Sequence, residues 1–465
     1  ELAANRYANE EAVNYYSRAL TLADPSDYTT SYELLLAREK IYALVGDHEK
    51  QAQDLAQMKQ AAAQLGDNHK HTEVSLRHAL FAEAIGDYKT AVSHARNTAI
   101  LAETVGDHKN KANSHLCWGR ALLRQGQYET AKQQFRQVLS QTTDDTRKIA
   151  ADSQRNLGII SVDLGQLDAA KSYYLDALAA YQKIRDQIGA TTTLNNLGVL
   201  YWNLGDFQEA RKFYQDALTL YRQMGQRKGE GMVLGNLATL LMAYGDYANA
   251  LTYNQSALFI LKETGSKLGQ CYAYLNLGLT HLYGAEYENA LQNSKLALHI
   301  AQEIGGLRFR GYALINLGHV LHAQGKLNEA EKSYRDALSV WHDMEQANLA
   351  VESRAGIAAV TLQAGKLPDA LTQVDVIMRY LKQGNTLAGT EDPFKIYLTC
   401  YEVLTAVSDP RANQMLQTAY DQLQEQAMHI QDKETRHAFL NNVHNHQKLI
   451  SLHKKLRHKQ TKAYL

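Results

Sequence analysis

The sequence predicts an all-α chain: a solenoid of about nine helix pairs followed by a helical C-terminal cap. Only four of the 465 residues are proline, with none between Pro25 and Pro368, and proline interrupts helices. A glycine turn also recurs every 39–41 residues, and an Asn-Leu pair recurs every 40. A fixed period of this length is typical of stacked helical repeats. The turn glycines are Gly46, Gly86, Gly126, Gly165, Gly205, Gly245, Gly284, Gly325 and Gly365.

The order of the elements follows from this register. Residues 1–24 are predicted to form the second helix of a truncated preceding repeat, because Ala12, Tyr15 and Ala19 fit the spacing of the later second helices. Residues 25–384 form the solenoid of about nine 40-residue repeats. A Gly- and Thr-containing break at residues 384–393 separates the solenoid from the rest of the chain, and residues 385–465 are predicted to form the C-terminal helical cap and a basic tail.

Small residues mark where the two helices of a pair cross. Gly198 lies in the first helix of its repeat, and Ala210 and Ala217 lie in the second. Removing side chains at these positions lets the helices approach closely. The turn glycine is free to take the positive φ that ends a helix. One pair cannot bury its own apolar stripe, so successive pairs must stack.

The Asn-Leu-Gly of the first helix, the glycine turn and the paired alanines of the second helix together resemble the tetratricopeptide repeat. The period is 40 residues instead of 34, which resembles the longer repeats of kinesin light chains. We expect the extra residues to fall between the second helix and the next first helix, in segments such as 224–227 and 264–267. The resemblance implies a superhelix whose first helices line a concave, peptide-binding face.

Both ends of the chain resemble a second group of proteins. The opening Leu2–Tyr16 and the segment Ile430–Val443, with its R-x-x-F-L-x-N-V pattern, are similar to parts of bacterial signal-transduction ATPases of the STAND type. This resemblance implies that the chain is the C-terminal, ligand-sensing part of a larger regulator. A nucleotide-binding core would then lie N-terminal to it.

Composition and motifs exclude several classes of function. Lys and Arg number 49, as do Asp and Glu, so the positive surplus that favours nucleic acid or anionic membranes is absent. No apolar run is long enough to span a bilayer, and three distant cysteines favour a reducing, cytoplasmic setting. The sequence contains no phosphate loop, zinc-protease or nucleophile-elbow motif. We therefore expect no enzyme activity, cofactor or metal site.

The candidate binding residues follow the repeat. One asparagine per first helix would lie beside the concave groove, and its amide both donates and accepts, which suits the main chain of an extended peptide. Asparagine at this position also hydrogen-bonds neighbouring helices in some repeats, so a purely structural role is the alternative. The ladder consists of Asn156, Asn196, Asn236, Asn276 and Asn316.

Specificity is expected from the residues four before, three after and seven after each asparagine. This surface is acidic in the fourth repeat and aromatic in the seventh and eighth, which predicts a partner segment with a basic end and an apolar end. The residues singled out are Asp152, Asp163, Asn203, Tyr272, Tyr283, Tyr312 and His319. Two other functions remain open: a free-standing adaptor or scaffold, and a small-molecule sensor, which a closed apolar pocket would favour.

Overall fold

The computed structural model describes residues 2–387 and 389–463, with side chains for residues 9–387 and 389–458. The chain is all-α over these residues, with 23 α-helices, one 3-10 helix and no strand. The side chains of Leu2–Ala8 and those beyond residue 458 lie outside the described part, so the proposed likeness of both ends is only partly visible. None of the described helices has both the length and the apolarity that a bilayer span requires.

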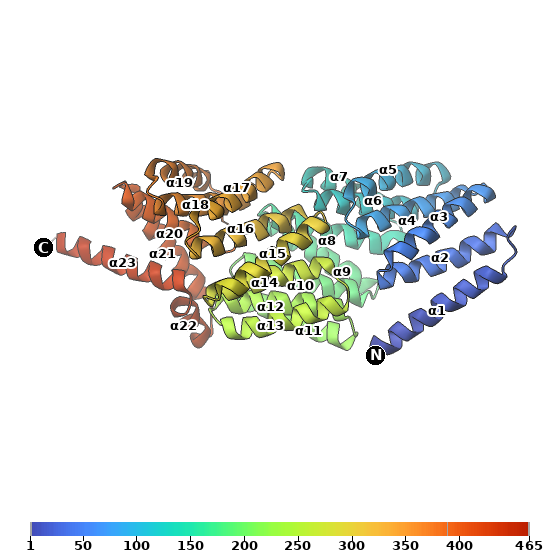
Figure 1. Ribbon diagram of the computed structural model, residues 1–465, viewed down its shortest axis with the longest axis horizontal. Helices are drawn as coiled ribbons and strands as arrows, with labels where there is room; N and C mark the ends of the chain where they lie inside the picture. The colour runs from blue at the N-terminus through green and yellow to red at the C-terminus, as the bar shows by residue number, and fades with distance from the viewer. Residues whose placement is uncertain (1, 388, 464–465) are drawn as a thin grey trace. The chain divides into compact units, whose positions relative to one another are not determined.

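The chain divides into two compact units (Figure 1). The first contains the residues up to Ile160 together with Asp176–Asp186, and the second contains Ser161–Leu175 and Gln187–Leu465. The helices assigned wholly to the first unit are α1 (Leu2–Leu22), α2 (Tyr28–Val45), α3 (His48–Leu65), α4 (Asn68–Ala84), α5 (Tyr88–Val105), α6 (His108–Arg124), α7 (Tyr128–Ser140) and η1 (Asp144–Thr146). Two helices contribute to both units, α8 (Arg147–Asp163) and α9 (Leu167–Lys183).

The second unit continues the same alternation of first and second helices. Its first helices contact one another in series, α10 with α12, α12 with α14, α14 with α16 and α16 with α18. Its repeat helices are α10 (Gln187–Asn203), α11 (Phe207–Gln223), α12 (Arg227–Ala243), α13 (Tyr247–Glu263), α14 (Lys267–Tyr283), α15 (Tyr287–Glu303), α16 (Leu307–Ala323), α17 (Leu327–Asp343), α18 (Ala347–Gln363) and α19 (Leu367–Lys382).

The 40-residue period consists of two 17-residue helices and two three-residue turns, as α10–α13 show. The expectation that the extra residues form a longer connection between repeats is therefore wrong. The connection 224–226 is as short as the turn 204–206 within the pair. The extra residues of the longer period lie in the helices, and a longer helix has a longer face to bury.

The middle residue of each three-residue turn takes a positive φ. Gly205 and Gly225 have φ of 75° and 66°, and backbone N–H groups of the turn satisfy the last helical carbonyls. In the seventh repeat the sequence assigned this role to Gly284, but Gly284 has φ −79° and Ala285 takes the left-handed conformation at 59°. Ala285 restores the 40-residue interval that Gly284 breaks. Glu345, in the turn between α17 and α18, is another non-glycine residue in this conformation, with φ 55°.

Glycines within the first helices allow close helix crossing, as expected. A Cβ atom added to Gly198 would lie 2.5 Å from the ring of Tyr214 on the partner helix. The ring of Tyr334 is enclosed more tightly, because Cβ atoms on either Gly318 or Gly356 would come within 2.5 Å of it. These aromatic rings therefore fill the space that the missing side chains leave.

The C-terminal cap comprises α20 (Pro393–Ala406), α21 (Arg411–His429), α22 (Lys433–Asn441) and α23 (His444–Ala463). α20 packs on α18 and α19 and so extends the stack (Figure 1). α22 reaches back to earlier repeats of the second unit, where the rings of Phe439 and Phe207 lie 5.9 Å apart. Tyr244 and Leu240 belong to the same apolar core. The cap thus contacts repeats that are distant in sequence.

Candidate functional site

One side chain per repeat marks a continuous series on the first helices, four residues before the ladder asparagine. The series, here called the −4 positions, is Asp152, Thr192, Met232, Tyr272, Tyr312 and Glu352. The sequence analysis did not include Glu352, because the ninth repeat has Gly356 where the ladder asparagine would stand. The 40-residue period alone would have found it.

The ladder asparagines of the second unit mostly bond their neighbours. Asn276 donates to the carbonyl of Gly235 at 3.2 Å, and Asn316 donates to that of Leu275 at 3.1 Å. Asn236 donates to the Asn195 side chain at 2.8 Å. All three are at most 6% exposed. These amides tie each first helix to the preceding one, which is the contact that the structural alternative expects.

The two other ladder residues differ. Asn156, in the first unit, is buried and donates to the carbonyl of Asp152 in its own helix at 2.7 Å. Asn196 is half-buried and has no hydrogen-bond partner among the described residues. A peptide would therefore find a free amide at Asn196, whereas elsewhere it would have to replace an existing bond. Peptide binding by the ladder stays a prediction.

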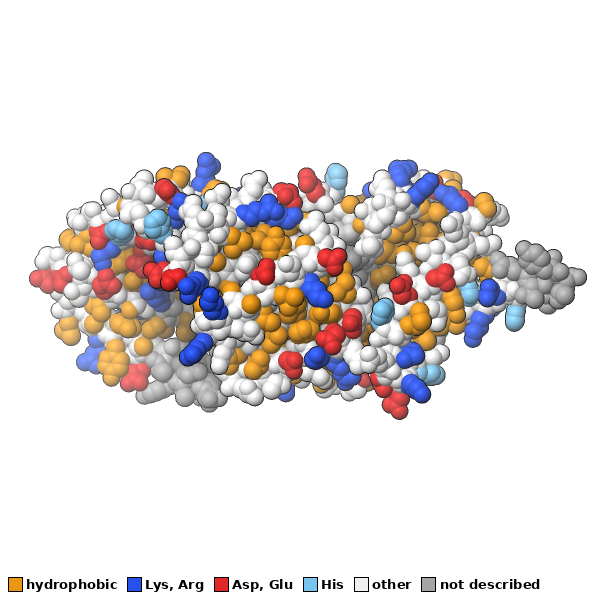
Figure 2. All heavy atoms as spheres, turned by 180° about the vertical axis from the view of Figure 1, so that it is seen from behind, with side chains coloured by type: hydrophobic (Ala, Val, Ile, Leu, Met, Phe, Trp, Pro, Cys, Tyr) orange, Lys and Arg blue, Asp and Glu red, His pale blue; other side chains and the backbone are white. Residues whose placement is uncertain are grey.

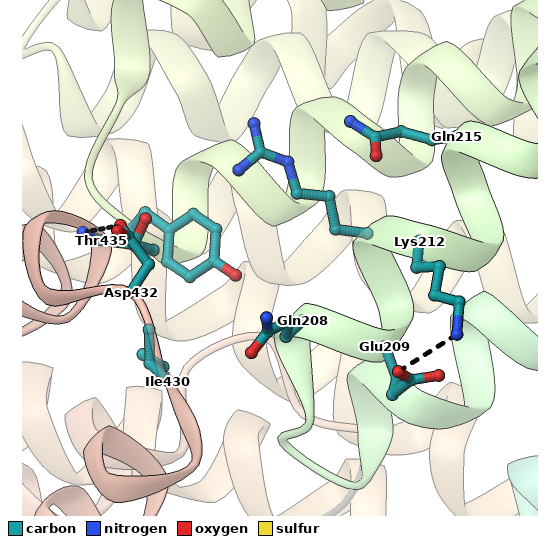
Figure 3. A pocket seen from close by; sticks show the side chains of 9 residues that line it. Gln208, Glu209, Lys212, Gln215, Ile430, Asp432 and Thr435 are labelled. Carbon is teal, nitrogen blue, oxygen red and sulfur yellow. Dashed lines mark hydrogen bonds and ion pairs between the residues drawn. The ribbon is translucent and has the colours of Figure 1, made fainter.

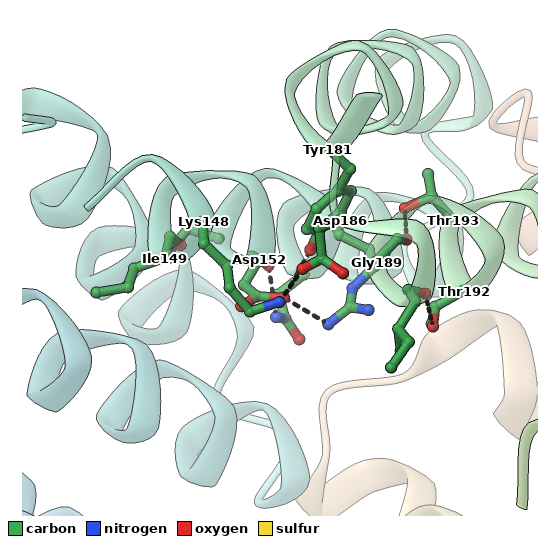
Figure 4. Close-up of polar contacts among 12 residues, drawn as sticks. Lys148, Ile149, Asp152, Tyr181, Asp186, Gly189, Thr192 and Thr193 are labelled. Carbon is green, nitrogen blue, oxygen red and sulfur yellow. Dashed lines mark hydrogen bonds and ion pairs between the residues drawn. The ribbon is translucent and has the colours of Figure 1, made fainter. Parts of the chain in front are cut away.

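Asp152 is already engaged within the first unit. Its carboxylate accepts a hydrogen bond from the Tyr181 hydroxyl at 2.6 Å and from Arg155 at 3.0 Å (Figure 4). Lys148 and Asp186 form a neighbouring ion pair. Because a hydroxyl and a guanidinium already satisfy this carboxylate, its negative charge is not available without a rearrangement.

The fifth repeat repeats this arrangement without charges. The Thr192 and Tyr221 hydroxyls lie 2.8 Å apart in the second unit. Asn203 donates to the carbonyl of Val199, one turn earlier in α10, at 2.8 Å. Both side chains that the sequence assigned to a binding face here are satisfied inside their own repeat.

The eighth and ninth repeats instead hold another part of the chain. The linker lies between α19 and α20, and its described residues are 383–387 and 389–392; Gly389 and Glu391 contact the −4 positions. The Tyr312 hydroxyl donates to the Gly389 carbonyl at 3.3 Å, and the Glu391 N–H donates to the Glu352 carboxyl group at 3.1 Å. Leu387 is 6% exposed and belongs to the adjacent core. Side chains of two successive first helices thus hold linker main-chain groups two residues apart.

Other predicted side chains lie around this contact. The ring of Tyr283 stacks on Tyr247, with ring centroids 5.5 Å apart, and the charges of Glu391 and Asp392 act on its hydroxyl. The Tyr272 hydroxyl donates to Asn236 at 3.0 Å, and Glu391 acts on it as well. Burial raises the pKa of both tyrosines. They are therefore neutral hydroxyls at ordinary pH.

His319 joins the same region from α16. Its Nδ1 lies 2.7 Å from the Tyr334 hydroxyl, and its Nε2 lies 3.7 Å from a Glu352 oxygen. Burial lowers the pKa of His319 well below its usual range, so the imidazole is neutral at pH 7. A neutral imidazole has one ring N–H, so it can donate to only one of these two contacts, and it does not act as a cation.

Asp163, the remaining predicted acid, forms an ion pair with Arg308 of α16 inside the second unit. Arg308 also lies 3.3 Å from the Tyr312 hydroxyl. The two acids that predicted a basic end of the partner, Asp152 and Asp163, are therefore both paired with arginines of the chain itself.

The linker contact buries acidic groups close together. Burial raises the pKa of Glu352 to about 7, and burial together with the charge of Glu352 raises that of Glu391. Lys395 of α20 is the neighbouring cation, and burial lowers its pKa. Asp392 caps α20 by accepting from the Lys395 N–H at 3.0 Å and also accepts from Asn445 at 2.6 Å.

A cavity of about 400 Å³ lies in the second unit between α11 and the α21–α22 connection (Figure 3). Its lining is mostly charged or amide side chains, and Asp432 accepts from the Thr435 N–H beside it. A small-molecule sensor was expected to show a closed apolar pocket, and this cavity lacks that character. The lining residues are Gln208, Glu209, Arg211, Lys212, Gln215, Tyr244, Ile430, Asp432 and Thr435.

The described residues form no metal cluster, and those on the face that Figure 2 shows form no single-charge surface patch. Figure 2 shows basic and acidic side chains interspersed over one face, with apolar ones between them. No group of three potential metal ligands occurs among the described residues. The three cysteines are buried, and burial raises the pKa of Cys271 to about 12, which suppresses its reactive thiolate form.

Known proteins share this repeat. Residues 149–223 and 311–343 each match a model of the tetratricopeptide repeat. No curated protein matches the sequence. Among solved structures, a Rap conjugation gene regulator of plasmid pLS20 in complex with the Phr* peptide matches with TM-score 0.54 and 15% identity, over 74% of this chain and 97% of that one. A Rap protein complexed with Competence and Sporulation Factor matches with TM-score 0.50 and 15% identity, over 84% and 99%.

A STAND protein with a tetratricopeptide repeat sensor, from Pyrococcus horikoshii, matches with TM-score 0.47 and 17% identity. The match covers 78% of this chain and 53% of that protein, so the chain spans about half of its length. Identities this low speak for the fold alone. The repeat models, the 40-residue register and the paired helices agree with one another: residues 149–223 and 311–343 are tetratricopeptide repeats, and similar helix pairs continue on either side of them.

Proposed function

We propose that the chain is a protein-binding module that takes a peptide segment on the −4 positions of the seventh to ninth repeats. The observation that carries this proposal is the linker. Tyr312 and Glu352 hold the Gly389 carbonyl and the Glu391 N–H, so this face binds polypeptide main chain. Main-chain capture with pockets for selected side chains is a recurring mode of peptide recognition.

The relatives support a peptide in this role. One of the solved Rap proteins with the same fold is bound to the Phr* peptide. The repeat fold is typically a non-catalytic scaffold, and we propose no enzyme activity for the chain. The −4 tyrosines supply rigid, amphipathic contacts, which are frequent anchors of protein interfaces.

The wider context is a second part of the proposal. We place the chain as the sensor of a STAND-type regulator, on the likeness of its two ends to such proteins. Size tests this directly: an antibody to the chain should detect a native protein well above 52.1 kDa. A native band near 52.1 kDa would leave a free-standing adaptor instead.

Peptide binding is tested with a phage-displayed library of random dodecapeptides, panned against the full chain. Enriched peptides should lose about tenfold or more in affinity when Tyr272→Ala and Tyr312→Ala are combined, since anchor truncation costs more than about 1 kcal/mol. Tyr253→Ala is the matched control, because Tyr253 is 36% exposed on the second helix α13. Failure to enrich any peptide, or equal affinity for both variants, would contradict the proposal.

The asparagine ladder is tested with the same peptides. Asn196→Ala combined with Asn236→Ala should cost roughly 1 kcal/mol for each amide that binds peptide. Because Asn236 already bonds Asn195, urea unfolding of the same variant shows how much of its role is structural. Unchanged peptide affinity with reduced stability would assign the ladder to helix packing.

A further inference from the structure

The linker is bound to the repeats by only some of its groups. Its main chain bonds Tyr312 and Glu352, and the Leu387 and Thr390 side chains are 6% and 2% exposed. The Glu391 side chain is different: its Oε2 atom is buried and has no hydrogen-bond partner among the described residues. A buried carboxyl oxygen without a donor costs free energy, so this position opposes the contact that its neighbours make.

The charges around Glu391 add to this cost. Glu352, Glu391 and Asp392 face one lysine, Lys395, and their charges act on one another. With all four groups ionised, three negative charges meet one positive charge, a net charge of −2. The neighbouring imidazole of His319 is held neutral and does not offset it. The linker therefore either carries an unfavourable charge where it touches α18 or takes up protons there, as the raised pKa values of Glu352 and Glu391 indicate.

A peptide with different chemistry would avoid this cost. In an otherwise identical segment, a basic residue at the Glu391 position would balance two acids, Glu352 and the aspartate at the Asp392 position, against two cations. The main-chain bonds to Tyr312 and Glu352 do not depend on the side chain, so they would remain. An apolar residue at the position of Leu387 would keep the buried contact with the core.

We propose that linker residues 387 and 389–392 are a weak built-in occupant of the eighth and ninth repeats, displaced by a partner peptide with an apolar residue at the Leu387 position and a Lys or Arg at the Glu391 position. This inference rests on the proposed peptide-binding function and names its partner chemistry. Binding is then a competition, because the free energy of closing the linker lowers the apparent affinity of the partner.

Two synthetic peptides test the charge preference. One has the sequence of residues 386–393, and the other is identical except for the change E391K. On the full-length chain near pH 7.5, the Lys peptide should bind at least about tenfold more tightly, which corresponds to about 1.4 kcal/mol. The linker competes equally with both peptides, so the ratio does not depend on how often it opens. Equal affinities would overturn the inference.

The variant Glu352→Gln tests whether the charge of Glu352 causes the preference for the Lys peptide. Glutamine retains an oxygen that accepts the main-chain N–H but removes the negative charge. In this variant the ratio between the Lys and Glu peptides should fall to less than about threefold, well under 1 kcal/mol. Glu425→Gln is the matched control, since Glu425 is an exposed acid on α21. A ratio that persists in Glu352→Gln would place the peptide elsewhere and overturn the assignment.

Hydrogen exchange at the residue 391 amide reports displacement directly. Saturating Lys peptide should increase its exchange at least about tenfold, because the bond to Glu352 is lost when the linker leaves. In the chain itself, Glu391→Lys should slow this exchange and weaken peptide binding. If Glu391→Lys misfolds by circular dichroism, the wild-type measurement still decides.

Peptide binding and exchange at the residue 391 amide together distinguish failure of this inference from failure of the proposed function. A library peptide that binds through Tyr272 and Tyr312 while the residue 391 amide stays protected would leave the function standing and remove the linker as competitor. Absence of any peptide binding, even to a chain whose linker is opened by Leu387→Asp, would remove both. In Leu387→Asp, faster exchange at residue 391 confirms that the linker has opened.

Discussion

The fourth and fifth repeats differ from the eighth and ninth at one register position. In the former, the −4 side chains Asp152 and Thr192 meet a tyrosine hydroxyl from their own second helix, 29 residues later. In the latter, the residues at that spacing are Trp341 and Leu381, which carry no hydroxyl. The −4 groups Tyr312 and Glu352 therefore lack a tyrosine partner from their second helix and bond the linker, while the Tyr312 hydroxyl also accepts from Arg308 at 3.3 Å.

This difference shows how a repeat protein makes a site from a periodic scaffold. Buried polar groups need partners. Where the repeat supplies one, as Tyr181 does for Asp152, the position is structural. Where it supplies none, the position is available to another segment. The identity of the residue 29 positions later is thus a sequence-readable signal for binding repeats.

The largest expected effect is a change with pH in the free energy of unfolding that Glu352 of the ninth repeat contributes. Burial raises the pKa of Glu352 to about 7, so folding favours its protonated form. Its contribution is fully present below about pH 4.5 and is lost as pH rises through about 7, a change of about 3 kcal/mol. The unfolding free energy of the wild type minus that of Glu352→Gln should fall by this amount between pH 4.5 and 8 in urea titrations.

Other groups facing Glu352 are present in both proteins of that comparison. Buried His319, with its lowered pKa, destabilises the fold as pH falls, and Glu391 and Lys395 are ionisable in both proteins. The difference therefore reports Glu352 together with the pKa shift that its charge causes in Glu391. Thr192→Val, at the −4 position of the fifth repeat, should give a pH profile parallel to the wild type. A flat difference for Glu352→Gln would contradict its burial as an acid.

The second effect concerns packing in the two regions. Gly318→Ala and Gly356→Ala should each destabilise by about 1–3 kcal/mol, because the added Cβ would lie 2.5 Å from the Tyr334 ring. Alanine otherwise stabilises a helix relative to glycine, so a loss identifies the clash. Gly198→Ala should cost less, because the ring of Tyr334 is confined by two glycines. Urea unfolding measures all three variants. Unchanged stability in Gly318→Ala and Gly356→Ala would refute the close packing around Tyr334.

The third effect is a series of hydroxyl deletions. Tyr181→Phe should cost about 1.5–3 kcal/mol, because its 2.6 Å bond goes to a carboxylate, and Tyr221→Phe about 1 kcal/mol for a neutral bond. Tyr312→Phe should cost less than about 1 kcal/mol for its 3.3 Å bond, yet it alone should speed exchange at Glu391. A large stability loss in Tyr312→Phe would mean that the linker is structural.

The smallest effect should be equal in the two regions. Arg185 and Glu345 occupy left-handed turn positions with φ of 58° and 55°, where glycine carries no strain. Arg185→Gly and Glu345→Gly should each stabilise by up to about 1 kcal/mol in thermal unfolding. Gln166→Gly is the control, since position 166 follows the left-handed residue. Unequal gains would show that turn strain differs between the regions.

Most of the repeat architecture was predictable because its signals are local. Asn-Leu-Gly, the turn glycines and the paired alanines report contacts within one or two repeats, and the all-α solenoid predicted from them is confirmed. Gly198 illustrates this, because its contact with Tyr214 lies only 16 residues away. The turn of the seventh repeat was misassigned to Gly284 because alanine rarely takes a positive φ.

The sequence by itself therefore determined the period, the pairing of the helices and the register that defines the −4 positions. Only the tertiary structure decided what those side chains touch. Tyr312 meets Gly389 from 77 residues away, and Asp163 meets Arg308 across still more of the chain. Local sequence records helix formation and close crossing, because both depend on neighbours in the chain. The position of the linker depends on how many repeats are stacked before the chain returns, which no single repeat encodes.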